Sequence, residues 1–133
     1  MQKIEHIGIA VKDLEASIAL YEKLLGTSCY KTEVVESEGV KTAFFEVGPN
    51  KIELLAATRE DSPIAKFIEK KGEGIHHIAF AVGTVEPELE RLSAEGFQLI
   101  HTQPKAGADQ KNIAFLHPKS TGSTLIELCA DNK

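Results

Sequence analysis

The sequence predicts an α+β fold built from two tandem βαβββ modules. One observation is a repeated segment: residues 4–11 read IEHIGIAV, and residues 75–82 read IHHIAFAV. Another is that the segment IELL at residues 52–55 returns as IELC at residues 126–129. A third is that the same order of extended and helical patterns links these segments in both halves. The chain of 133 residues therefore divides into two related modules.

The first module is expected to run strand, helix and three further strands. Residues 3–11 are rich in β-formers, and Asp13 follows them as a helix N-cap. Apolar side chains then recur at helical spacing as far as Leu25, and Gly26 suits the end of that helix. The remaining strands of this module are expected near residues 28–36, 39–48 and 51–57.

A connector interrupts the repeat before the second module begins. Ser62 and Pro63 match an N-cap followed by proline at the first helical position, and a short amphipathic pattern follows. Each half alone would bury too little surface for independent stability, so the two should share a core. We therefore expect a single domain over residues 1–133, with module one at about 1–57, a connector at 58–73 and module two at about 74–133.

The second module repeats the order of the first. Residues 75–82 form the expected first strand, and Thr84 can cap a helix that has Pro87 in its first turn. Gly96 ends this helix as Gly26 ends the earlier one. Strands are then expected near residues 97–101, 111–117 and 123–130, with a polar loop at residues 102–110.

Composition limits the classes of function. Hydrophobic residues make up 42% of the chain and charged residues 26%, as in an ordinary globular protein, and the net charge of −5 argues against a general nucleic-acid binder. Cys29 and Cys129 lack metal or redox spacing and are interpreted as buried thiols in a reducing compartment. No apolar run approaches the ~20 residues that span a membrane, and no signal peptide is evident, so we expect a cytoplasmic protein.

The alternation of side chains along a strand selects two of the histidines. His6 shares a strand face with Gly8, and His77 shares one with Ala79, whereas the opposite faces carry larger apolar side chains. Small residues beside a histidine leave room for a ligand. His76 falls on the opposite face from its neighbour His77, which makes His77 the counterpart of His6.

Each module also supplies one carboxylate, and together these residues suggest a metal site. Glu53 follows His6 by 47 residues, and Glu127 follows His77 by 50 residues. Taken alone, each histidine would be interpreted as a structural residue and each glutamate as an exposed strand charge. The repetition of both favours a divalent metal that accepts N and O ligands: Co²⁺, Ni²⁺, Mn²⁺, Fe²⁺ or Zn²⁺.

Four protein ligands on an octahedral ion leave two positions for a substrate that chelates through two oxygens. Such a metal acts as a Lewis acid that stabilises an enolate. A nearby carboxylate can move a proton to or from the adjacent carbon, an effect worth roughly 10²–10⁴-fold. The chemistry predicted from the residues is therefore proton abstraction next to a carbonyl, and no nucleophile pattern competes with it.

Tandem modules with one histidine and one glutamate each resemble the vicinal-oxygen-chelate (glyoxalase/bleomycin resistance/dioxygenase) superfamily. Within it, the sequence is most similar to the methylmalonyl-CoA epimerases, and the likeness covers essentially the whole chain. The resemblance implies a curved eight-stranded mixed sheet with helices on its outer face. The segments that carry the resemblance are IEHIG at 4–8, DSPIA at 61–65, GIHHI at 74–78, FLHPK at 115–119 and LIEL at 125–128.

The resemblance implies that His6, Glu53, His77 and Glu127 hold the metal, with Co²⁺ favoured. Glu53 stands where some family members have Gln, so its charge is expected to tune the metal. The implied substrate is methylmalonyl-CoA, whose C2 is inverted by removing a proton from one face and returning it to the other. A homodimer is expected by resemblance alone.

Two catalytic bases are implied, and Glu127 is the one on the metal side. Some family members carry a glutamate on the third strand of the first module, where this chain has Thr42, and threonine is not a credible base. Glu46 lies on the same strand face and is a candidate, although a solvated rim charge is the plainer interpretation. Glu53 is the other candidate.

Coenzyme A carries phosphates, which basic loops of the second module could contact. The candidates are Lys105, Lys111 and Lys119, whose alternative interpretation is plain surface charge. His117 is expected to support the turn at Pro118 and not to bind a ligand.

Three other functions fit parts of the pattern. Glyoxalase I belongs to the same superfamily and uses a similar set of His and Glu ligands to isomerise a glutathione hemithioacetal. A non-catalytic binding module of this fold would leave all four ligands unexplained. An extradiol dioxygenase would use two His and one Glu with iron, usually in a longer chain. The connector and the His117-Pro118-Lys119 segment favour the epimerase.

Overall fold

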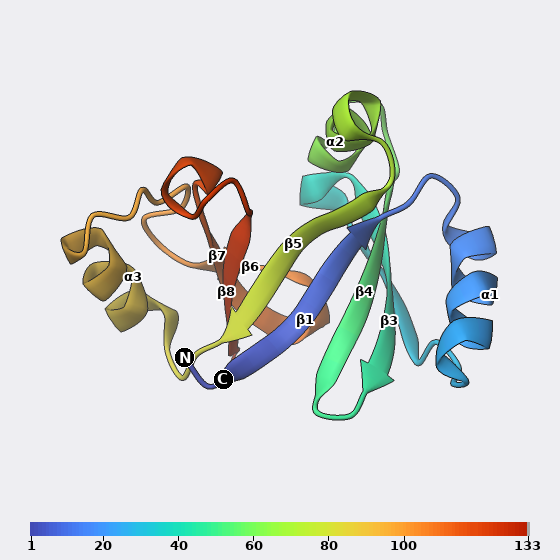
Figure 1. Ribbon diagram of the computed structural model, residues 1–133, viewed down its shortest axis with the longest axis horizontal. Helices are drawn as coiled ribbons and strands as arrows, with labels where there is room; N and C mark the ends of the chain where they lie inside the picture. Colours follow the sequence, from blue (N-terminus) through green and yellow to red (C-terminus); the bar gives the residue numbers. More distant parts are fainter. Residues whose placement is uncertain (133) are drawn as a thin grey trace. The chain divides into compact units, whose positions relative to one another are not determined.

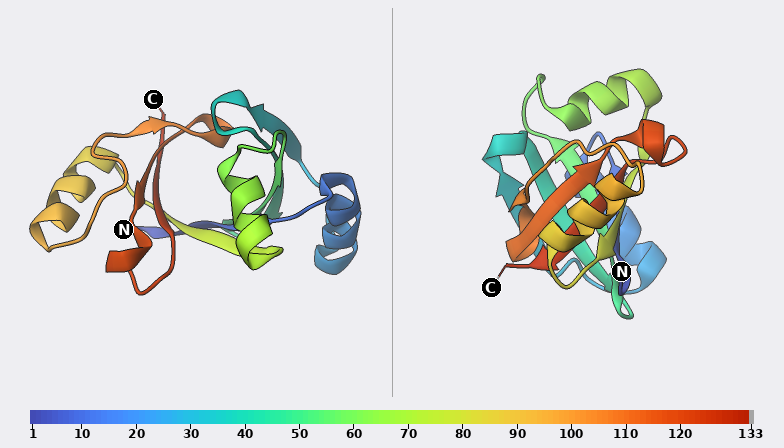
Figure 2. Two further views of the ribbon diagram at one scale, coloured as in Figure 1. Left: turned by 90° about the horizontal axis from the view of Figure 1, so that it is seen from above. Right: turned by 90° about the vertical axis from the view of Figure 1, so that its left-hand side faces the viewer.

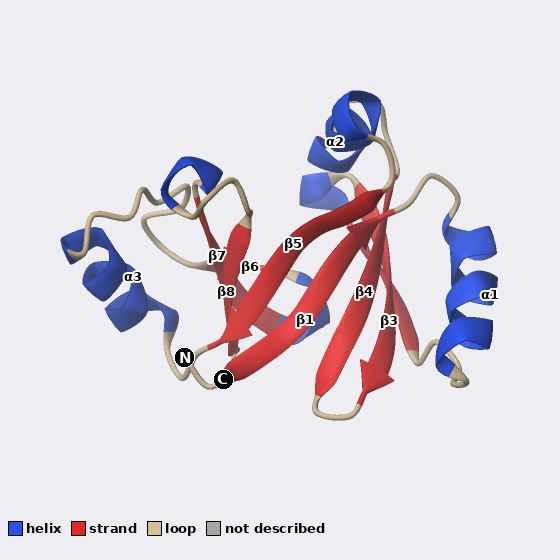
Figure 3. Cartoon of the chain, viewed as in Figure 1, coloured by secondary structure: helices blue, strands red, loops and turns tan. Residues whose placement is uncertain are grey.

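The computed structural model describes residues 1–132. Over that range the chain forms eight β-strands and three α-helices, which is the α+β class that the sequence predicts (Figure 1 and Figure 3). The α-helices are α1 (Leu14–Leu25), α2 (Pro63–Lys71) and α3 (Val85–Ala94). The strands are β1 (Lys3–Ala10), β2 (Lys31–Val35), β3 (Val40–Val47), β4 (Asn50–Ala57), β5 (Gly74–Ala81), β6 (Lys105–Ala106), β7 (Lys111–Leu116) and β8 (Ile126–Asp131). Short 3₁₀ turns occur at η1 (Glu36–Glu38), η2 (Ala108–Gln110) and η3 (Pro118–Ser120).

The chain divides into two compact units, one of residues His6–His76 and the other of Met1–Glu5 with His77–Lys133. The first unit has the strand order β2-β3-β4-β1, and the second has β5-β8-β7-β6. In each unit the first and last strands of the module pair in parallel, and the other pairs are antiparallel. The strands of each unit are therefore mixed in direction, and the predicted βαβββ order is confirmed in both modules.

Helix α1 covers one face of the first sheet, as predicted. The Asp13 side chain accepts a hydrogen bond from the Ala16 N–H at 3.1 Å, and Gly26 ends the helix with a left-handed φ of 68°. The helix packs over a cluster that includes Phe45 and Leu54, both fully buried. These two side chains alternate with those on the opposite face, which is left free of α1.

Helix α2 lies within the connector and begins at the predicted N-cap. It packs on the opposite face of this sheet from α1. The Ser62 hydroxyl accepts a hydrogen bond from the Ala65 N–H at 3.1 Å. The helix buries Ile64 against Ala10 and Leu55, which share their strand face with His6 and Glu53. Figure 2 shows α1 and α2 on opposite sides of β3 and β4. The connector therefore closes one end of the face that carries the first histidine and glutamate.

In the second unit, α3 packs on the face of β7 and β8 that carries the large apolar side chains. Val85, Leu89 and Leu92 from the helix join Leu116 and Leu128 in one buried cluster. Thr84 occupies the N-cap position, but its side chain makes no capping hydrogen bond. The predicted boundary is thus correct, while the predicted side-chain cap is not observed.

The expected strand at residues 97–101 is wrong. This segment meets β7 at an isolated bridge between Leu99 and Leu116, with backbone hydrogen bonds on either side of it, and is not part of a named strand. The backbone N–H of Phe115 donates to the Nδ1 atom of His101 at 3.0 Å, so a side chain occupies the place of a ladder carbonyl. The strand beside β7 is instead the two-residue β6, which lies inside the expected polar loop and pairs Lys105 with Ile113.

The two cysteines differ in burial. Cys129 is buried as predicted, whereas Cys29 is only half-buried, and the two do not form a disulfide. Cys29 follows the C-terminal end of α1, and its thiol donates to the carbonyl of Lys31 at 3.3 Å. None of the helices within residues 1–132 is long and apolar enough to span a membrane.

The turn between β2 and β3 packs tightly against the start of the connector. Gly39 has a left-handed φ of 63°, and a Cβ atom at this position would lie 2.8 Å from the Arg59 Cζ atom and 2.9 Å from the Ser62 Cβ atom. Arg59 Nη1 also donates to the carbonyl of Glu36 at 2.7 Å, across the same turn. Ser62 is fully buried and caps α2, so it has little freedom to move away.

We expect Gly39→Ala to lower the free energy of unfolding by about 2–5 kcal/mol, because a left-handed backbone costs about 1–2 kcal/mol for a residue with a Cβ and overpacking costs about 1–3 kcal/mol more. Gly48→Ala is the matched control, since Gly48 has a φ of 61° with no atom within 4 Å of the added Cβ. It should lose only about 1–2 kcal/mol. Urea titration of both variants measures the difference, and equal losses would contradict the close contact.

Candidate functional site

In the first unit, parallel pairing of β1 and β4 brings His6 next to Glu53. The register places Gly8 opposite Glu53, so the histidine two residues earlier lies on the same face of the neighbouring strand. The His6 Nε2 atom is 3.1 Å from the Glu53 Oε1 atom. Both residues are buried, with 6% and 5% of their surfaces exposed. Glycine opposite the carboxylate leaves this part of the face open.

The second unit contains the same arrangement. Ala79 pairs with Glu127 in the parallel β5–β8 ladder, again two residues after the histidine. The His77 Nε2 atom is 3.1 Å from the Glu127 Oε1 atom. The two residues are 4% and 5% exposed. The structure therefore reproduces, in each module, the pairing of one histidine with one glutamate that the repeat predicts.

The two adjacent histidines of β5 have different surroundings. His76 is half-buried, and the edge of its ring meets Phe67 of α2 at a centroid distance of 4.8 Å. The Lys71 Nζ atom lies over the Phe67 ring, 5.8 Å from its centroid. His76 thus packs against the connector, whereas His77 meets a carboxylate. The selection of His77 by strand alternation agrees with this geometry.

The candidate bases on β3 are less well placed than Glu53 and Glu127. The Thr42 side chain is only 1% exposed, and its hydroxyl donates to the carbonyl of Glu33 at 3.3 Å. Glu46 lies on the same face near the end of the strand, where it is exposed and pairs in register with Lys51. Its environment is that of a rim carboxylate.

The three lysines predicted to contact phosphates lie in separate settings. Lys111 forms an ion pair with Asp131 across β7 and β8, which already neutralises part of its charge. Lys105 is half-buried in β6, and Lys119 is exposed in η3. His117 accepts the Lys119 N–H at its Nδ1 atom at 3.1 Å, which confirms that it supports the turn at Pro118.

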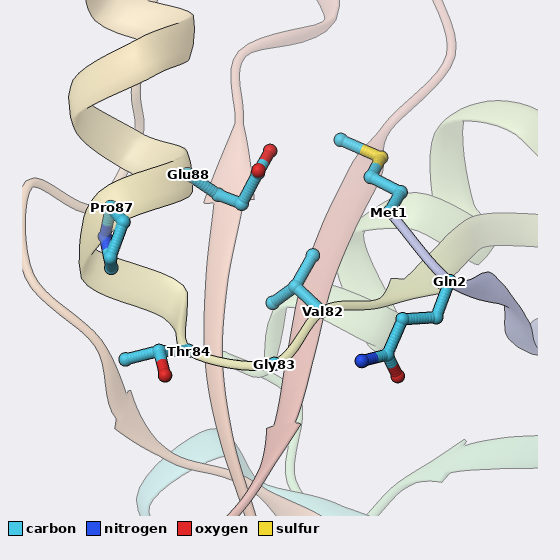
Figure 4. Close-up of a pocket in the computed structure, with 7 residues that line it drawn as sticks. All are labelled: Met1, Gln2, Val82, Gly83, Thr84, Pro87 and Glu88. Carbon is cyan, nitrogen blue, oxygen red and sulfur yellow. The ribbon is translucent and has the colours of Figure 1, made fainter.

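A hollow of about 350 Å³ lies at the N-terminal end of α3 (Figure 4). It contains none of the predicted site residues. Glu88 is the one carboxylate among its lining residues, and a hydrogen bond from Arg91 lowers the pKa of Glu88 below its ordinary value. The carboxylate is therefore ionised and paired at neutral pH. The lining consists of Met1, Gln2, Val82, Gly83, Thr84, Pro87 and Glu88.

The donor set of the two pairs fits a divalent transition metal. Each pair offers one imidazole nitrogen and one carboxylate oxygen, buried and on the same strand face. Such mixed N and O donors suit Co²⁺, Ni²⁺, Mn²⁺, Fe²⁺ and Zn²⁺ better than Ca²⁺ or Mg²⁺, which prefer oxygen alone. A buried carboxylate beside an imidazole also suits proton transfer.

Sequence comparison agrees with this fold and donor set. The family model for the glyoxalase/bleomycin resistance protein/dioxygenase superfamily matches residues 5–115. The chain belongs to this superfamily. The match begins just before His6 and ends at Phe115, so it covers both His strands.

Individual members of the superfamily are similar over nearly the whole chain. The sequence is 43% identical over 129 residues to the uncharacterized protein YqjC of Bacillus subtilis, covering 97% of this chain and 92% of that one. It is 39% identical over 128 residues to the ethylmalonyl-CoA/methylmalonyl-CoA epimerase of Cereibacter sphaeroides, covering 95% and 96%. A structure of methylmalonyl-CoA epimerase in complex with methylmalonyl-CoA and NH₄⁺ aligns with a TM-score of 0.94 at 36% identity, covering 98% and 95%.

The two histidines of β5 allow a direct test of which one binds metal. We expect His77→Ala to weaken Co²⁺ binding by more than about 100-fold, because even partners that only orient a ligand are worth about 10–100-fold. His76→Ala should leave Co²⁺ binding nearly unchanged and lose only the ring contact with Phe67. Calorimetric titration of both variants with Co²⁺ measures this difference. The reverse order of effects would refute the assignment by strand face.

Proposed function

We propose that this protein is a methylmalonyl-CoA epimerase, which interconverts the C2 epimers of its substrate by proton abstraction and return. The observation that carries the proposal is the buried His–Glu pair repeated in both modules. Comparison supports the proposal, because the chain is similar over nearly its whole length to proteins named as epimerases of methylmalonyl-CoA. The substrate is accordingly an acyl-CoA that carries a carboxylate next to the reacting carbon.

We further propose that His6, Glu53, His77 and Glu127 together hold one divalent ion, with Co²⁺ favoured and Ni²⁺, Mn²⁺, Zn²⁺ or Fe²⁺ as alternatives. The geometry within each unit supports this, since in each pair the Nε2 and Oε1 atoms are 3.1 Å apart. When bound, such an ion supplies Lewis-acid stabilisation of the negative charge that develops on the substrate oxygen. The small residues Gly8 and Ala79 leave space beside the carboxylates.

The proton transfers are assigned to carboxylates of the chain. We propose Glu127 as the base that removes or returns the C2 proton on one face of the substrate, and Glu53 as the base on the other. Each is buried beside a histidine that can orient it. Glu46 is the weaker candidate for the second base because it is exposed at the end of β3. Thr42 is set aside, since its hydroxyl is bonded to a backbone carbonyl.

The CoA phosphates are assigned to the basic residues around β6, β7 and η3. Lys119 is the best placed of the three because it is exposed, whereas Lys105 is half-buried and Lys111 forms an ion pair with Asp131. The homodimer and the cytoplasmic location stay predictions; the location is supported by the bacterial epimerase among the similar proteins.

Deuterium exchange distinguishes the proposed reaction from its rivals. Metal-loaded protein incubated with methylmalonyl-CoA in D₂O should place deuterium at C2 of the substrate, because the abstracted proton exchanges with solvent. A parallel reaction with methylglyoxal and glutathione should yield no lactoylglutathione. Lactoylglutathione in the second reaction, without exchange in the first, would identify a glyoxalase I. Inactivity in both, with no metal in the purified protein, would indicate a binding module.

The proposed base Glu127 can be distinguished from the weaker candidate Glu46 by isosteric substitution. Glu127→Gln should slow deuterium exchange by about 10²–10⁴-fold, because general base catalysis contributes an effect of that size. Glu46→Gln is the control on an exposed carboxylate and should change the exchange rate by less than about twofold. Single-turnover measurements at saturating substrate make the comparison. A large loss in Glu46→Gln would instead assign the second base to Glu46.

A further inference from the structure

We propose that Phe115 and His101 are positioning residues that hold the His77 imidazole facing Glu127. The proposal concerns the second unit alone. It deepens the proposed function, on which its metal-binding readout rests, but its first readout needs no metal. Neither residue belongs to the predicted ligand set. His101 ends the segment where the expected strand at residues 97–101 is absent, and Phe115 lies in the neighbouring strand β7.

Phe115 contacts the histidine directly. The Phe115 and His77 ring centroids are 5.7 Å apart, and the ring planes are nearly perpendicular at 87°. Phe115 is also the register partner of Glu127 in the antiparallel β7–β8 ladder. One aromatic ring therefore flanks both members of the His77–Glu127 pair, whose Nε2 and Oε1 atoms are 3.1 Å apart. Edge-to-face packing restricts rotation of the imidazole about its Cβ–Cγ bond.

His101 in turn fixes Phe115. Its Nδ1 atom accepts the Phe115 N–H at 3.0 Å, and its ring lies 5.8 Å from the Phe115 ring at an angle of 52°. The backbone beside His101 also bonds to Phe115, since the N–H groups of Ile100 and His101 donate to the Phe115 carbonyl at 2.9 and 3.3 Å. Phe115 is thus held at its amide, its carbonyl and its ring. Simple core packing does not require a histidine side chain at a position where a backbone carbonyl would serve.

These contacts predict a graded effect. A favourable aromatic pair corresponds to a factor of about 2–13 in an equilibrium constant. Phe115→Leu keeps apolar bulk but loses the ring edge, so Co²⁺ affinity should fall about threefold to tenfold. Phe115→Tyr keeps the ring and should retain wild-type affinity. His101→Asn keeps an acceptor close to the position of Nδ1, whereas His101→Leu removes it, so only His101→Leu should resemble Phe115→Leu.

The direct test is the state of the His77 ring in the metal-free protein. Ring ¹⁵N–¹H correlation spectra should show one narrow set of His77 signals in the wild type, Phe115→Tyr and His101→Asn. Phe115→Leu and His101→Leu should show broadened or doubled His77 signals. Thermal unfolding is measured in parallel, and if His101→Leu does not fold, the Phe115→Leu and Phe115→Tyr pair decides the question alone.

His117→Leu is the matched control, since His117 Nδ1 accepts a backbone N–H of the same kind but in η3. It should leave the His77 signals and Co²⁺ affinity unchanged. A single narrow set of His77 signals in Phe115→Leu, or an equal disturbance in His117→Leu, would overturn the proposal. If the wild-type protein binds no Co²⁺ yet the His77 signals respond as expected, the positioning role stands and the proposed metal function fails.

Discussion

The parallel pairing of the first and last strands of each module is the constraint on which the candidate site depends. In both modules the residue two positions after the histidine pairs with the glutamate: Gly8 with Glu53, and Ala79 with Glu127. Because side chains alternate along a strand, a shift of one residue in either ladder would move the glutamate to the opposite face. The same Nε2–Oε1 separation of 3.1 Å in both units is the result of this shared register.

Apolar packing on the opposite faces offsets the cost of burying these polar pairs. Removing a histidine and a carboxylate from water is unfavourable unless they are paired, and each pair supplies its own partner. Leu54 and Leu128 are adjacent in sequence to the two glutamates and are fully buried beneath α1 and α3. Burying each of these side chains contributes roughly 1.5–3 kcal/mol, which holds the strand at the depth where its polar neighbour is shielded. Residues that stabilise the fold and residues of the candidate site therefore alternate along the same strands.

The sequence was sufficient to predict the βαβββ order and the helix boundaries at Asp13 and Ser62, because these follow from local periodicity and capping. The association of one histidine with one glutamate in each module was predicted from the repeat, since both residues recur at matching places in the two halves. It did not reveal that the His101 side chain replaces a ladder carbonyl, since a strand-like pattern at residues 97–101 has no local signal for this. It also did not show that α2 would lie on the sheet face that carries His6 and Glu53, because an amphipathic helix does not specify which sheet face it covers. Ion pairing of Lys111 with Asp131 depends on a register between distant strands and was likewise hidden.

The two modules have different lengths of chain between the equivalent histidine and glutamate. Glu53 follows His6 by 47 residues and Glu127 follows His77 by 50, yet both pairs have the same register. The extra residues lie outside the paired strands, because the connections at residues 95–104 and 117–125 are longer than their counterparts at 26–30 and 48–49. Evolution can therefore lengthen, shorten or recharge these connections without disturbing the register that pairs each histidine with its glutamate.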